Sequence, residues 1–137
     1  MIKTSGQHGR PKVLEDMKAL LGEVSGVVFK HPDEKTFYIA GDTVWCQAVE
    51  DNLKKYHPDI VVLNSCDAQV IGNESIIMGK QDIYEVYKAA PEATVIASHM
   101  EAVNHATLTR AALRDYLAEH AMTDRVLVPE DGETCAL

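Results

Sequence analysis

The stretch Thr36-Phe-Tyr-Ile-Ala-Gly-Asp-Thr43 decides the fold that the sequence predicts. Its first part, Phe37-Tyr-Ile39, is aromatic and β-branched, as in a buried strand, and it stops at Gly41. Glycine lets the backbone turn sharply at this point. The strand is therefore expected to deliver the carboxylate of Asp42 to a loop at its carboxyl end.

Two histidines are natural companions of Asp42. His8 lies between two glycines near the N-terminus, and His99 follows the apolar run 94–98. Each lies beside a turn and a predicted strand end, so we expect the three side chains to converge on one rim. Two imidazoles and a carboxylate are good ligands for a divalent metal such as zinc. Taken singly, each residue also fits an ordinary turn or strand-end role; their order and positions together favour a metal site.

Composition indicates one domain, residues 1–137, with a sizeable core. Hydrophobic residues make up 46% of the chain and charged residues 25%. The net charge of −8 argues against nucleic acid or an anionic membrane as a partner. No long apolar run is present, so a cytoplasmic location is expected. The three cysteines are widely spaced and predict free thiols, with Cys66 buried and inert.

Periodicity and turn residues predict an alternation of helices and strands. Residues 1–10 and 65–79 are expected to be irregular, apart from a possible short extended piece at 75–78. Predicted helices cover 11–21, 46–57, 81–90 and 109–121, and predicted strands cover 25–30, 36–40, 59–64, 94–98 and 125–128, with a short terminal strand after Pro129. The first two strands form a hairpin, and the continuous apolar strand 59–64 suggests that both sheet faces are covered. This alternation predicts a layered α/β fold with sites at the carboxyl ends of its strands.

The segment His99-Met-Glu-Ala-Val-Asn-His105 is rich in polar side chains. Its two histidines are six residues apart and do not share a helical face, which excludes the zinc helix of HExxH proteases. If His99 binds a metal, Glu101 is expected to orient ligands, together with Thr43 beside Asp42. Asn104 and His105 are the candidate substrate contacts. A polar loop without such roles is an equally good interpretation of Glu101 and Asn104.

Several pieces of the sequence together resemble metallo-β-lactamase-fold hydrolases, in particular the branch similar to L-ascorbate-6-phosphate lactonases. They run in family order along nearly the whole chain: Gly6-Gln-His-Gly9, Ser25-Gly-Val-Val28, Phe37-Tyr-Ile-Ala-Gly-Asp-Thr-Val-Trp45, Pro58-Asp-Ile-Val-Val-Leu-Asn64, Met78-Gly79, Ala97-Ser-His-Met-Glu101, Asn104-His105 and Val128-Pro-Glu-Asp-Gly-Glu133.

The resemblance implies an αββα sandwich with one or two metal ions, zinc or else manganese or iron, and hydrolysis of an ester, lactone or phosphoester-type bond. By position it makes His8, Asp42 and His99 metal ligands, with Asp42 as the bridging, catalytic carboxylate. The family's HxHxDH motif is absent, so the resemblance implies the C-terminal half only, a layered sheet with helices on one face that lacks the full ligand set for catalysis by itself.

A half-sandwich would expose the sheet face that normally packs on the other half. We therefore expect a homodimer about a twofold axis, or a missing N-terminal half. The alternative function is a non-catalytic α/β module that dimerises or binds a partner and keeps a remnant of the metal site. A nucleotide-binding domain is disfavoured, because neither GxGxxG nor GxxxxGK[ST] occurs.

Overall fold

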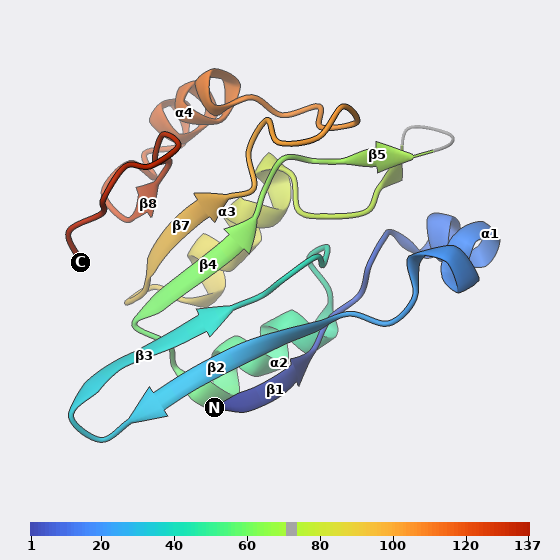
Figure 1. The fold of residues 1–137 in the computed structure, drawn as a ribbon. Helices are drawn as coiled ribbons and strands as arrows, with labels where there is room; N and C mark the ends of the chain where they lie inside the picture. The colour runs from blue at the N-terminus through green and yellow to red at the C-terminus, as the bar shows by residue number, and fades with distance from the viewer. Residues whose placement is uncertain (71–73) are drawn as a thin grey trace.

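The computed structural model describes residues 1–70 and 74–137 and has a mixed α/β architecture (Figure 1). A main sheet has the order β1-β2-β3-β4-β7-β8, and a small antiparallel pair, β5 and β6, lies beside it. The strands are β1 (Ile2–Ser5), β2 (Ser25–His31), β3 (Glu34–Ile39), β4 (Ile60–Asn64), β5 (Gln69–Val70), β6 (Glu74–Ser75), β7 (Thr94–Ser98) and β8 (Val126–Leu127). The helices are α1 (Pro11–Leu21), α2 (Gln47–Tyr56), α3 (Lys80–Ala89) and α4 (Arg110–Glu119).

Strand direction brings five carboxyl ends, those of β1, β3, β4, β7 and β8, to the same edge of the main sheet. Strands β1, β2 and β3 pair antiparallel, which gives β1 the same direction as β3. Strands β3, β4, β7 and β8 pair parallel. The loops that follow β1, β3, β4 and β7 therefore all leave the sheet at one edge, which is where open α/β sheets bind their ligands.

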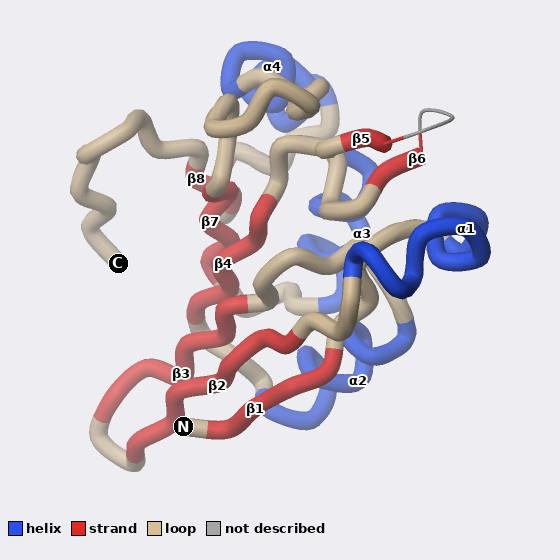
Figure 2. The backbone as a smooth tube through the Cα atoms, turned by 45° about the vertical axis from the view of Figure 1, so that its right-hand side comes forward, coloured by secondary structure: helices blue, strands red, loops and turns tan. Residues whose placement is uncertain are grey.

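The helices lie on one face of the sheet. The connections β3-α2-β4, β4-α3-β7 and β7-α4-β8 all advance in one direction through the strand order. Because parallel crossovers are almost always right-handed, they place their helices on the same side. Figure 2 shows α2 and α3 on one side of the strands, and the C-terminal segment on the other.

Two neighbouring rows of side chains show how differently the two faces are buried. The row on the helical face is almost fully buried and consists of Val28, Tyr38, Val61, Val95 and Val126. The row on the other face is also apolar but only partly buried, and consists of Val27, Ile39, Val62, Ile96 and Leu127. We call this second row, with Phe29 and Phe37 beside it, the open face. It is an apolar surface that no helix of the described residues covers.

Most predicted elements are confirmed, and their ends have local causes. Helix α1 begins at Pro11, whose fixed φ suits the first turn, and ends at Gly22, which has φ 68°. Helix α4 is capped by Thr109, whose hydroxyl accepts a hydrogen bond from the N–H of Ala112 at 3.2 Å. Helix α2 ends at His57, the residue before a proline.

Three predictions about the elements are wrong. Residues 2–5 form β1 instead of a loop, because they pair with β2, a distant segment that local sequence does not reveal. The extended piece is Glu74–Ser75 rather than 75–78, and no strand follows Pro129 in the described C-terminal segment. Strand β4 is covered by helices on one face, as the half-sandwich implies. The predicted irregular region 65–79 includes residues 71–73, which lie outside the described part of the chain.

Candidate functional site

Asp42 lies in the loop after β3, as the sequence predicted. Gly41 has φ 76°, and a Cβ atom there would come within 2.9 Å of the carbonyl oxygen of Ser25, so both the turn and the close approach require glycine. One carboxylate oxygen of Asp42 accepts a hydrogen bond from the side-chain amide of Asn64 at 2.6 Å. Because Asn64 ends the neighbouring strand β4, it fixes the direction of the Asp42 carboxylate.

The loop that carries His8 is tied to the loop that carries Asp42. The fully buried hydroxyl of Thr43 accepts a hydrogen bond from the N–H of Gln7 at 2.8 Å. In return, the carbonyl of Gln7 accepts from the N–H of Val44 at 2.9 Å. Thr43 therefore positions the backbone next to His8, and its predicted role in supporting metal ligands stays a prediction.

The side chain of His8 lies in a cavity of about 330 Å³ that Lys18 and Glu23 also line. Its Nδ1 is 3.2 Å from the carbonyl oxygen of Leu21. A carbonyl oxygen can only accept a hydrogen bond, so in neutral His8 the ring N–H is on Nδ1. Nε2 then carries no hydrogen and is the atom that could bind a metal.

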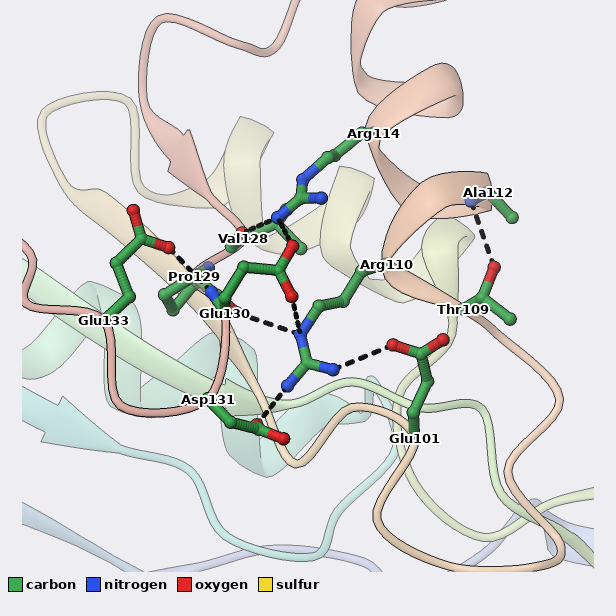
Figure 3. Close-up of polar contacts among 10 residues, drawn as sticks. All are labelled: Glu101, Thr109, Arg110, Ala112, Arg114, Val128, Pro129, Glu130, Asp131 and Glu133. Atoms are coloured by element: carbon green, nitrogen blue, oxygen red, sulfur yellow. Dashed lines mark hydrogen bonds and ion pairs between the residues drawn. The ribbon is translucent and has the colours of Figure 1, made fainter.

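His99 follows β7 directly, at the same edge of the sheet. Both His99 and Glu101 have φ 57°, the left-handed region that non-glycine residues seldom adopt. Between them, Met100 is buried in the core. The carboxylate of Glu101 does not approach His99 but forms an ion pair of 2.8 Å with Arg110 on α4 (Figure 3).

Asn104 and His105 are exposed on the loop before α4. Nδ1 of His105 is 3.2 Å from the side-chain oxygen of Asn104, and the carbonyl of His105 accepts from the N–H of Gln69. Within the described residues, no hydrogen bond joins either side chain to His8, Asp42 or His99. Their predicted contact with substrate stays a prediction.

The structure thus orders the three predicted ligands along one edge without forming a closed metal site. Two strand spacings, roughly 10 Å, separate the ends of β3 and β7. Across residues 1–70 and 74–137, no three His, Cys, Asp or Glu side chains are grouped so as to hold a metal ion. Imidazole and carboxylate are suitable donor types for a divalent metal, but the donors of this chain alone are too few at any one point.

Two residues of the site were missed by sequence reasoning. Asn64 carried a usable signal, because it ends a predicted strand next to Asp42 in the parallel order. Arg110 carried no such sequence signal, because its contacts with Glu101 and with the loop after β8 form only when these separate segments pack against α4. The predicted burial of Cys66 is confirmed, and burial raises the pKa of its thiol, which disfavours the reactive thiolate.

Comparison with known proteins relates the chain to metal-dependent hydrolases. No family model matches it. It is 52% identical over 134 residues to the UPF0173 protein YddR of Bacillus subtilis (strain 168), a match that covers 98% of this chain and 52% of that protein. Among solved structures, it is similar to an isothiocyanate hydrolase from Delia radicum gut bacteria, with a TM-score of 0.94, 49% identity and coverage of 98% and 52% of the two chains.

A second solved structure, a possible metal-dependent hydrolase from Veillonella parvula DSM 2008, has a TM-score of 0.95 and 40% identity, with coverage of 98% of this chain and 53% of that one. The chain thus spans about half the length of the relatives it matches. Its fold is that of one part of such metallo-hydrolases, which confirms the predicted fold class.

Proposed function

We propose that this chain is part of a metal-dependent hydrolase of the metallo-β-lactamase type, with His8, Asp42 and His99 as metal ligands. The observation that carries the proposal is the common edge: all three residues follow strands that end there, and Asn64 and Thr43 hold two of the three loops. The identity of about half to relatives described as hydrolases supports the same reaction class.

The bound metal, zinc or alternatively manganese or iron, would supply Lewis-acid activation of substrate and water. This chain's own residues do the positioning. The amide of Asn64 donates to one oxygen of Asp42, so the second oxygen is the one directed to a ligand. The contact between His8 and the carbonyl of Leu21 keeps Nε2 free in the same way. Such supporting groups change metal affinity about 10- to 100-fold in known sites.

The proposal extends to the finer features of the resemblance. The chain corresponds to the C-terminal half of the sandwich, in the branch of the L-ascorbate-6-phosphate lactonases, and the remaining ligands come from a segment outside these 137 residues. An ester, lactone or phosphoester-type bond is the proposed substrate, with Asn104 and His105 as its nearest contacts. The relative described as an isothiocyanate hydrolase adds the isothiocyanate group as a second substrate class to assay.

The alternative is a non-catalytic α/β module with a remnant of a metal site. It is favoured by the lack of any three-donor cluster among the described residues. Metal analysis of the purified chain separates the two functions, because a remnant site would hold no stoichiometric metal.

We expect Asp42→Ala to lower the affinity for zinc at least about tenfold, because it removes the ligand between the two histidines. The measurement is elemental analysis and calorimetric zinc titration of a protein of the relatives' length that contains this chain, so that the remaining proposed ligands are present. Asp33→Ala, at the exposed tip of the β2–β3 hairpin, is the matched control and should leave binding unchanged. Wild-type protein without metal, and with the same stability in chelator, would contradict the metal site and favour the alternative.

The open face is the second part of the proposal. We propose that a second α/β layer covers it, supplied by another copy of the chain or by the remaining half of a protein of the relatives' length. Five aliphatic side chains in register across five strands form a continuous apolar surface, which suits a packed sheet. The isolated chain is therefore expected to be a dimer by light scattering, and a well-folded monomer would contradict this.

The three cysteines are free. Free thiols suit a reducing compartment, which supports the proposed cytoplasmic location. Among the residues that the structure describes, no helix has the length and apolar content needed to cross a bilayer.

A further inference from the structure

Arg110 on α4 is the centre of a polar network that joins two loops, the one after β7 and the one after β8, next to His99 (Figure 3). Its Nη1 donates to Glu101 at 2.8 Å, its Nε donates to the carbonyl of Pro129 at 3.0 Å, and its Nη2 pairs with Asp131. Only 12% of its side chain is exposed, although it lies at the surface end of α4. All three nitrogens of its guanidinium are therefore engaged, and the group acts as a fixed fork.

The helix that carries Arg110 is itself rigidly placed. Thr109 caps its first turn, and Leu113 and Leu117 are buried in the core. A guanidinium at the first residue of such a helix has a fixed base. It can therefore hold a mobile partner in place, which a residue on a flexible loop cannot do.

The segment 99–101 contacts Arg110 and has a backbone conformation that depends on tertiary contacts. His99 and Glu101 both have φ 57°, a conformation that persists in non-glycine residues only when the surroundings impose it. Two contacts impose it here: Met100 is buried in the core, and Glu101 is bound by Arg110. Without the second contact, only Met100 and the end of β7 would define the direction of the imidazole of His99.

Arg110 also forms a wall of the space that His99 faces. The two residues line the same cavity of about 240 Å³, together with Asp131 and Gly132 from the loop after β8. The contacts of Arg110 with Pro129 and Asp131 fix that loop, while its contact with Glu101 fixes the His99 segment. One side chain thus sets the separation of the two walls.

We propose that Arg110 is the positioning residue for His99: it clamps Glu101 and the loop after β8 to α4, and so fixes the imidazole and the cavity beside it. This inference deepens the proposed function, because its effect on metal binding rests on His99 being a ligand. The clamp itself does not depend on a metal. It can be measured in the metal-free chain.

The experiment compares Arg110→Gln, Glu101→Gln and the double variant with wild type. The first readout is hydrogen exchange and the imidazole NMR resonance of His99 in the metal-free 137-residue chain. We expect exchange in 99–103 to rise roughly tenfold in both single variants. Hydrogen exchange in 99–103 should be no faster in the double variant than in Arg110→Gln, because both changes remove the same contact.

Two further variants keep the test sharp. Arg114→Ala is the matched control, because Arg114 binds the carbonyl of Val128 and the carboxylate of Glu130 but not Glu101. It should loosen the loop after β8 and leave the His99 resonance unchanged. Arg110→Lys keeps the charge and loses the fork, so it should not restore the wild-type resonance. Glu101→Gln leaves α4 untouched and keeps the test valid if Arg110→Gln folds poorly.

The second readout is cobalt(II) titration of a protein of the relatives' length that contains this chain, followed by the absorption spectrum of the bound ion. We expect roughly tenfold weaker binding and an altered spectrum in Arg110→Gln and Glu101→Gln. Unchanged exchange and an unchanged His99 resonance in both variants would overturn the positioning role and leave the proposed function standing. If wild type binds no cobalt while the variants still shift exchange, the proposed function fails and the clamp is upheld.

Discussion

Replacing Leu63 with alanine is expected to lower the free energy of unfolding by about 2 to 5 kcal/mol, because it opens a cavity in a packed core. Leu63 lies on the helical face of β4 and is 0% exposed. Ile96, on the adjacent strand β7, lies on the open face and is only partly buried. For Ile96→Ala in the monomer, a loss of about 1 kcal/mol is expected, since part of its surface already meets water.

The two variants respond differently to protein concentration if the open face binds a second copy. Denaturant unfolding of Leu63→Ala should give the same loss relative to wild type at every concentration, because its neighbours belong to one chain. The loss from Ile96→Ala should grow with concentration, as dimer formation buries the side chain further. A loss that stays flat over a hundredfold range of concentration would contradict dimerisation through the open face.

The two faces of the sheet also show which parts of the fold the hydrophobic pattern of the sequence predicts. The apolar and β-branched runs 36–40, 59–64, 94–98 and 125–128 identified all the parallel strands, β3, β4, β7 and β8. Helix patterns such as Val49 with Leu53 identified α2. Periodicity could not show that one face of β4 lacks helices, because Val62 and Ile96 are as apolar as the buried residues beside them. That distinction depends on the direction of the crossovers.

The candidate site was predicted as far as strand ends allow. A possible metal ligand at the end of an apolar run identified both Asp42 and His99. Strand β1 was missed because Ile2–Ser5 is short, mixed in polarity and paired with residues 20 to 26 positions away in the sequence. Its omission hid the reason that His8 reaches the same edge, namely that β1 runs in the direction of β3.

Contacts between loops were beyond sequence reasoning. The Thr43 contact with Gln7 and the Arg110 network each join segments that approach only in the folded chain. No spacing rule relates such pairs, which are 36 and 9 positions apart in the sequence. These contacts convert a set of ligand-type residues at one edge into a set with fixed directions.

Removing Arg10 is expected to lower the free energy of unfolding by about 3 kcal/mol, because it leaves a buried carboxylate without its counter-charge. One terminal nitrogen of Arg10 lies 2.7 and 2.8 Å from the two carboxylate oxygens of Asp82. The Asp82 side chain is 4% exposed, and that of Arg10 is 34% exposed. The partial exposure of Arg10 places the expected loss at the lower end of the range for buried pairs.

Because Asp82 is more deeply buried than Arg10, the two alanine variants are expected to differ in stability. Asp82→Ala should cost less, about 2 kcal/mol, because the freed guanidinium can be hydrated and the main loss is the hydrogen bond that Asp82 accepts from the N–H of Gly79. The pair Lys88–Glu85 on α3 is exposed and serves as the control, so Lys88→Ala should leave the urea midpoint almost unchanged. Since Arg10 precedes α1 and Asp82 lies in the first turn of α3, this pair fixes the loop of His8 to the helical layer. If Arg10→Ala and Lys88→Ala have the same urea midpoint, the Arg10–Asp82 pair does not stabilise the position of this loop.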